Sequence, residues 1–179
     1  MNDNNVNMED RTAPEKEIIR QRVEKLERLR KESKFDPYVI DKWDKEHKLS
    51  FVHEHFSHLG PDEMDETATI KTAGRVMTIR KHGRASFAHL EDDSERLQLY
   101  FQLNSLGEEE YEWFKRWVDT GDFLGIVGHP FRTKRGELSL LVTEFKLLSK
   151  ALRPLPEKWH GLKDTEVRYR QRYLDLIAN

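Results

Sequence analysis

Hydrophobic residues follow two different periods along the chain. Between residues 67 and 150 they recur at alternate positions in five runs, at about 68–80, 85–91, 96–102, 122–131 and 138–149. Alternation of this kind is typical of strands that bury one face. In EEEYEWFKRWV (108–118), by contrast, Tyr111, Phe114 and Trp117 lie at helical spacing, and the glutamates suit the first turn of a helix. The pattern therefore predicts three strands, a helix and two further strands.

This order of elements predicts a fold that is mainly β with helical extensions. A helix between the third and fourth of five strands is the arrangement of the oligonucleotide-binding barrel, or OB-fold. Two helices are predicted before the barrel, at about 12–34 and 48–59, and Gly74 predicts a bend or bulge in the first strand. We expect a disordered tail over 1–14, a helical extension over 15–66, the OB-fold domain over 67–150, and a linker with one helix over 151–179.

The predicted second and third strands expose an unusual set of side chains. If the leucines of these strands face the core, four other residues point to water: Phe87, His89, Gln98 and Tyr100. An exposed aromatic ring offers a surface on which a nucleic-acid base stacks, and a nearby glutamine has both a donor and an acceptor for a base edge. The alternative is that Phe87 closes the barrel against the N-terminal helix.

Two loops next to this face are basic. RKHGR (80–84) joins the first two strands and RTKR (132–135) follows the fourth, although residues 71–150 together hold 13 Lys and Arg against 12 Asp and Glu. OB-folds bind oligonucleotides on the face of strands two and three, between these same two loops. We predict that Phe87 stacks on a base and that Gln98 binds a base edge. Four loop side chains are predicted to bind phosphates: Lys81, Arg84, Lys134 and Arg135.

Composition and hydropathy narrow the class of protein. Hydrophobic residues make up 36% of the chain and charged residues another 36%, which predicts a modest core with solvated appendages. No apolar run approaches the roughly 18 residues of a membrane-spanning helix. The first ten residues, MNDNNVNMED, are polar and acidic, which argues against a targeting peptide. We therefore expect a cytoplasmic protein that has no membrane partner.

Catalytic and metal chemistry has little support in the sequence. The chain has no cysteine, so disulfides and thiolate sites are excluded. The histidines of HEHFSH (His53, His55 and His58) do not follow the HExxH zinc pattern, and a solvated helix face is the better interpretation. Neither a Walker loop nor a GxGxxG or GxSxG motif occurs. We assign no catalytic residue and no metal ligand.

The end of the chain resembles a known family. The segment GELSLLVTEFKLLSKALRPLPEKWHGLKDTEVRYRQRYLDLIAN (136–179) is similar to the junction between the anticodon-binding and catalytic domains of class II lysyl-tRNA synthetases. Within it, RYRQRYLDLIAN (168–179) has the form typical of the lysine enzymes. The preceding strands and KLERLRKESKFDPY near the beginning are also similar to this family. The resemblance covers about residues 15–179.

The resemblance implies roles for individual residues. In class IIb synthetases a phenylalanine of the second strand stacks on the central anticodon uridine, and a glutamine of the third strand recognises it; these match Phe87 and Gln98. The glutamate of the turn between strands four and five contacts anticodon bases and matches Glu137. A first-strand arginine also takes part, and of the two neighbouring residues Ile79 and Arg80 at this place, Arg80 is the better match. The implied partner is the anticodon stem-loop of lysine tRNA.

The resemblance also implies that the chain lacks the catalytic motifs of the family. In the family, the catalytic motifs that bind ATP, Mg²⁺ and lysine follow the RYRQRYLDL helix, and none of them is present in the sequence. We expect the chain to be the N-terminal portion of such an enzyme, with no cofactor and no lysine activation of its own. The full-length family enzyme uses ATP and Mg²⁺ and is expected to be a homodimer.

Two other functions stay open on the sequence. A general single-strand-binding OB-fold would use the same stacking face without base preference. A protein-interaction adaptor would use the charged helix at 14–34 as its active surface. Gln98 and Glu137 favour base-specific binding, because a general binder would carry more aromatic residues and fewer carboxylates beside the strands.

Overall fold

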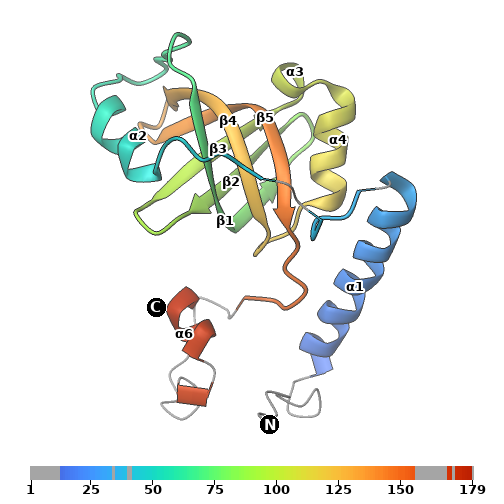
Figure 1. The fold of residues 1–179 in the computed structure, drawn as a ribbon. Helices are drawn as coiled ribbons and strands as arrows, with labels where there is room; N and C mark the ends of the chain where they lie inside the picture. The colour runs from blue at the N-terminus through green and yellow to red at the C-terminus, as the bar shows by residue number, and fades with distance from the viewer. Residues whose placement is uncertain (1–12, 34, 40–41, 156–168, 171, 179) are drawn as a thin grey trace. The chain divides into compact units, whose positions relative to one another are not determined.

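The structure is a computed structural model that describes residues 13–33, 35–39, 42–155, 169–170 and 172–178 (Figure 1). Residues 1–12 of the predicted tail and 156–168 of the predicted linker and last helix lie outside the described residues. The described residues up to Lys25 and from Leu152 onward form one compact unit, and residues 26–151 form the other. The first unit contains α6 (Arg172–Ala178), in which Tyr173 is exposed.

Helices precede the barrel, as predicted. The first is α1 (Ala13–Ser33), so Ala13 and Pro14 of the predicted tail are helical, and Leu26 and Leu29 are its buried residues. The second is α2 (Leu49–Phe56), which ends three residues before the predicted position. Within the described part of the chain, the helices are too short or too polar to cross a membrane.

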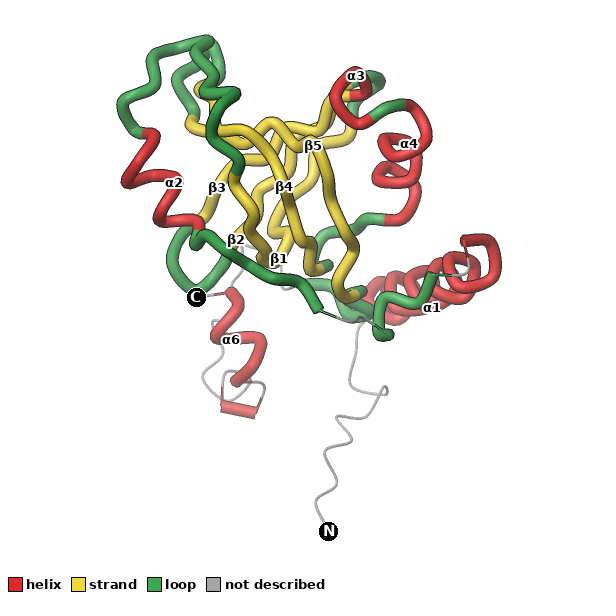
Figure 2. Tube along the Cα trace, turned by 45° about the horizontal axis from the view of Figure 1, so that its top comes forward, coloured by secondary structure: helices red, strands yellow, loops and turns green. Residues whose placement is uncertain are grey.

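Five strands close into a barrel in the second unit (Figures 1 and 2). They are β1 (Ile70–Lys81), β2 (Ala85–Glu91), β3 (Arg96–Gln102), β4 (Phe123–Arg132) and β5 (Leu138–Ser149). Their order around the barrel is β1-β2-β3-β5-β4, with β4 paired back to β1. The helices α3 (Leu103–Leu106) and α4 (Glu108–Trp117) lie between β3 and β4 in the chain. This order confirms the predicted OB-fold.

The core forms from the alternate residues that the sequence predicts to face inward. Leu90, Leu97 and Leu99 are fully buried. Phe101 of β3 stacks on Phe114 of α4, with ring centroids 3.9 Å apart. Burial of these apolar faces against one another supplies the main driving force for closing the barrel.

Gly74 is needed in β1 for a reason other than the predicted bend or bulge. The irregularity in the β1–β2 pairing lies between Val76 and Thr78, whereas Gly74 pairs regularly with β4. A Cβ atom on Gly74 would lie 2.5 Å from the carbonyl oxygen of Glu91. Gly74 is therefore required by the close approach of a neighbouring strand end.

The loop between β2 and β3 anchors the chain in front of α2. The Asp92 carboxylate accepts hydrogen bonds from Lys45 Nζ (2.7 Å), from the backbone N–H of Leu49 (2.9 Å) and from Ser94. Burial opposes the charge of this carboxylate, but the hydrogen bonds outweigh it, so the pKa of Asp92 lies well below its ordinary value of 3.8. This loop fixes α2 beside the β2–β3 end of the barrel.

A buried ion cluster closes the end of β5. The ammonium of Lys150 is fully buried and donates to Asp122 (2.7 Å), to Asp119 (2.6 Å) and to the carbonyl of Trp117 (2.7 Å). Burial raises the pKa of Asp122, while Lys150 and the backbone N–H of Ala151 oppose the rise. The cluster joins the end of the last strand to the loop after α4.

Candidate nucleic-acid interface

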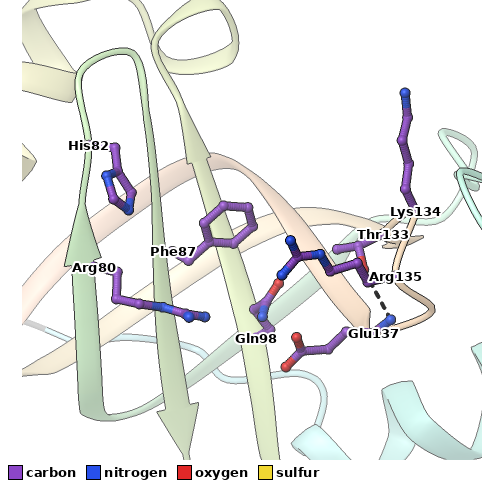
Figure 3. Close-up of a pocket in the computed structure, with 8 residues that line it drawn as sticks. All are labelled: Arg80, His82, Phe87, Gln98, Thr133, Lys134, Arg135 and Glu137. Atoms are coloured by element: carbon purple, nitrogen blue, oxygen red, sulfur yellow. Dashed lines mark hydrogen bonds between the residues drawn. The ribbon is translucent and has the colours of Figure 1, made fainter.

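A pocket of about 400 Å³ lies on the outer face of β1, β2 and β3, beside the turn between β4 and β5 (Figure 3). Its lining comes from three segments that are distant in sequence: Arg80, His82, Phe87, Gln98, Thr133, Lys134, Arg135 and Glu137. The fold therefore brings together all the predicted site residues except Lys81 and Arg84.

Phe87 provides the aromatic surface of the pocket. It lies on the face opposite the buried Leu90, as the alternation predicts, and it is half-buried. Its ring stacks on Tyr100 of β3, with centroids 4.7 Å apart and planes inclined by 23°. The Tyr100 ring lies in turn 5.7 Å from that of Phe131. Phe87 is thus the end of a row of three rings, and its packing on Tyr100 restrains its orientation.

Gln98 is buried, which corrects the expectation that it points to water. It is only 4% exposed, because β3 is covered on its second edge by β5, where Ser139 lies in register with Gln98. The Ser139 hydroxyl lies 3.1 Å from Gln98 Oε1 and 3.2 Å from the backbone oxygen of Glu137. Alternation within one strand cannot reveal this neighbour. The amide of Gln98 is therefore held in place at the base of the pocket.

The turn between β4 and β5 is closed by its own hydrogen bonds. The N–H of Thr133 donates to the Glu137 carbonyl (2.9 Å), and the N–H of Glu137 donates to Thr133 Oγ1 (3.0 Å), drawn as the dashed line in Figure 3. Gly136 has a φ of +87°, a conformation that residues with a Cβ rarely adopt. The turn fixes the backbone of Glu137, and the carboxylate lies 3.1 Å from Nε2 of His89 on β2.

Cationic side chains surround the pocket. Arg80, Lys134 and Arg135 are exposed, and the Lys134 ammonium lies 3.7 Å from the carboxylate of Asp62. Glu137, whose side chain is 50% exposed, is the acidic residue of the lining. In Figure 3 the guanidinium of Arg80 extends toward the side of the pocket where Gln98 and Glu137 lie. An exposed cationic rim around an aromatic and polar floor suits a polyanion with planar bases.

Comparisons with known proteins agree with this geometry. Residues 70–148 match the tRNA anti-codon family, described as an OB-fold nucleic acid binding domain. A lysine–tRNA ligase of Thermotoga maritima is 48% identical over 164 residues, which are 92% of this chain and 32% of the relative. One of Methanoculleus marisnigri is 47% identical over 159 residues, 88% of this chain and 30% of the relative. One of Thermoanaerobacter pseudethanolicus is 43% identical over the whole chain, which covers 34% of that relative.

Over most of its length the chain is therefore similar to part of lysine–tRNA ligases, and residues 70–148 match their kind of anticodon-binding OB-fold. It spans about a third of the length of the curated relatives it matches. The matched OB-fold domain, residues 70–148, carries every residue that lines the pocket.

Two of the predicted phosphate-binding residues of this OB-fold domain lie outside the pocket. The ammonium of Lys81 donates to the carbonyls of Lys115 (2.7 Å) and Val118 (2.6 Å) at the end of α4. Carbonyls in the last turn of a helix lack intrahelical partners, so a lysine at this place satisfies them. The guanidinium of Arg84 lies 3.3 Å from the side-chain oxygen of Asn104 in α3. The carbonyls that bind Lys81 come from residues 34 and 37 positions later in the chain, which the loop sequence does not reveal.

Sequence reasoning did not assign a role to three residues of this region. His82 and Thr133 line the pocket, and His89 contacts Glu137. The available signals were weak: His82 and Thr133 lie within the two basic loop segments, and His89 follows Phe87 by two positions on the same strand face.

The histidines of α2 and the residues after it are not part of the pocket. His55 and His58 are exposed, as a solvated helix face predicts, whereas His53 is half-buried and its Nε2 lies 2.9 Å from the carbonyl oxygen of Arg96. Among the described residues, no group of three or more His, Cys, Asp and Glu side chains is suited to hold a metal ion.

Proposed function

We propose that this chain binds the anticodon stem-loop of lysine tRNA, as the anticodon-recognition region of a lysine–tRNA ligase. The observation that carries the proposal is the composition of the pocket. It combines an aromatic ring, a fixed amide and a carboxylate within a cationic rim, on the face that OB-folds use for oligonucleotides. The similarity to lysine–tRNA ligases supports lysine tRNA as the RNA.

The pocket has groups suited to a single unstacked uracil. The free face of Phe87 stacks on the base, since its other side packs on Tyr100. An amide N–H of Gln98 donates to a uracil carbonyl oxygen, and a carboxylate oxygen of Glu137 accepts the N3–H. Arg80 lies beside these two groups and binds a second acceptor on the bases or the backbone.

The exposed loop cations have a different task. Lys134 and Arg135 lie on the rim and bind the phosphates of the anticodon loop, and these contacts hold the RNA without distinguishing its bases. Arg84 contributes to the same field from the loop between β1 and β2. Lys81 contributes less than its position in the sequence predicts, because the end of α4 already takes up its ammonium.

We further propose that a full-length lysine–tRNA ligase containing these residues attaches lysine to tRNA with ATP and Mg²⁺, as a cytoplasmic homodimer. These 179 residues by themselves bind the RNA but do not activate lysine, since they correspond to about a third of the matched ligases. The expected result is that the purified chain shows no lysine-dependent exchange of pyrophosphate into ATP. Measurable exchange from this chain alone would contradict this part of the proposal.

A binding titration tests the anticodon assignment. A fluorescent stem-loop with a UUU anticodon is titrated with the chain at one fixed salt concentration, in parallel with the same stem carrying an unrelated loop of equal length. We expect the UUU loop to bind at least about tenfold more tightly, which corresponds to ~1.4 kcal/mol. Equal affinity for both loops would indicate a general single-strand binder, and binding to neither would favour a protein-interaction adaptor.

A further inference from the structure

His89 lies beside the pocket and links three segments of the domain. Its Nδ1 lies 2.8 Å from Thr78 Oγ1 on β1, and its Nε2 lies 3.1 Å from Glu137 Oε1 in the β4–β5 turn. In the sheet, Thr78 pairs with His89 and His89 pairs with Gln98. His89 therefore contacts one of the predicted base-binding side chains and neighbours another.

The partners of the ring determine the direction of its hydrogen bonds. An ionised carboxylate can only accept, so Nε2 carries the proton and donates it to Glu137. In the neutral ring Nδ1 then accepts the proton of the Thr78 hydroxyl. The hydrogen bonds thus run from Thr78 to His89 to Glu137, and rotation of the imidazole would break both of them.

We propose that His89 is a positioning residue for base recognition, which acts through Glu137. This inference rests on the proposed function of the pocket. His89 holds one carboxylate oxygen of Glu137, so the other oxygen stays directed to a base N–H. A half-exposed glutamate on a turn otherwise samples several rotamers, and ordering it before the RNA arrives removes part of the entropic cost of binding.

A purely structural role for His89 predicts a different coupling. If the ring only filled space in the sheet, its loss would lower the RNA affinity equally whether or not residue 137 is a glutamate. If it positions the Glu137 carboxylate, its loss matters only while that carboxylate is present. A double-mutant cycle between the two residues separates these cases.

The experiment uses the 179-residue chain and two stem-loops, one with a UUU anticodon and one with UCU. His89→Ala should weaken binding of the UUU loop roughly threefold to tenfold, the range expected for losing one pre-ordered side chain. Binding of the UCU loop should change less, because cytosine lacks the N3–H that the carboxylate accepts. In the Glu137→Ala background, His89→Ala should have no further effect. His89→Gln should restore much of the affinity, since a glutamine N–H can occupy the place of Nε2.

Thermal melting of each variant checks that it is folded. If His89→Ala does not fold, His89→Gln still tests the proposal. Equal losses in the wild-type and Glu137→Ala backgrounds, or no loss at all, would overturn the positioning role. A wild-type chain that does not prefer the UUU loop would instead overturn the function on which the role rests, so the two failures are distinguishable.

Discussion

At the scale of single residues, Phe87 is the side chain whose role is simplest to isolate. It contributes to a cross-strand ring pair with Tyr100 but not to the core, which lies on the other face of β2. Phe87→Ala should weaken binding of the UUU stem-loop by roughly 1–3 kcal/mol, the usual contribution of one stacked base. The variant should stay folded, because a cross-strand pair contributes only about 0.2–1 kcal/mol to stability. Fluorescence titration and thermal melting measure the two effects.

A matched control is Phe123→Ala on β4. Phe123 is also partly exposed, at 37%, and it packs under the guanidinium of Arg75 away from the pocket lining. The control should leave RNA affinity unchanged. If Phe87→Ala lowered the melting temperature strongly while the control did not, Phe87 would be a core residue and the stacking role would be wrong.

Single residues also show what a sequence does and does not reveal. The side of β2 on which Phe87 lies follows from period two alone, since Ser86, Ala88 and Leu90 are buried. The burial of Gln98 does not follow, because it depends on the parallel pairing of β3 with β5, some 40 residues later in the chain. A strand's own pattern gives its faces, but not which neighbour covers them.

At the scale of elements, the two basic loops differ in how their cations are used. Lys134 and Arg135 are exposed on the turn between β4 and β5, whereas Lys81 is bound to the end of α4. Replacing Lys134 and Arg135 together with alanine should weaken binding to UUU and unrelated loops alike. The slope of log affinity against log salt is negative, and its magnitude should decrease by about 1.4, or ~0.7 for each lost phosphate contact to a single strand.

The control for this pair is the double replacement of Lys81 and Arg84, which removes the same charge. We expect it to change the salt slope less and to lower the melting temperature more, because the carbonyls at the end of α4 lose their partner. Changed base preference with an unchanged salt slope in the Lys134 and Arg135 variant would contradict a phosphate-binding role.

Element boundaries were well predicted where the period was clear. The bounds of β2, β3 and β5 agree with the alternation, and β1 and β4 differ by a residue or two. The short α3 was not predicted, since four residues are too few to show a helical period. The reason for Gly74 was also missed, because a close approach to the Glu91 carbonyl depends on the paired strand rather than on the strand that contains the glycine.

At the scale of the whole molecule, residues 42–69 are fastened to the barrel by polar contacts at several places, among them Trp43 with Thr72 and Arg132 with Leu59. Asp92 is the centre of one group of these contacts, with a side chain only 4% exposed that accepts hydrogen bonds from Lys45 and from the beginning of α2. Nearby, Asp93 forms an ion pair with Lys48 in which both side chains are exposed. Neighbouring aspartates in one loop thus allow a buried anchor to be compared with a surface pair.

Acid should loosen this attachment in a predictable range of pH. The pKa of Asp92 in the folded protein lies below its ordinary value of 3.8, so the unfolded chain binds the proton more tightly. The stabilisation is therefore complete well above pH 3.8 and is lost as the pH falls below it toward the folded-state pKa.

Asp92→Asn should lower stability near neutral pH by about 1–3 kcal/mol, the cost of losing hydrogen bonds to a charged group. It should also flatten the fall in melting temperature below about pH 4. Asp93→Asn should leave the melting temperature nearly unchanged, because an exposed ion pair contributes little. Melting curves of both variants from neutral to acidic pH measure these effects, and an equally steep acid transition in Asp92→Asn and wild type would show that other carboxylates control the attachment.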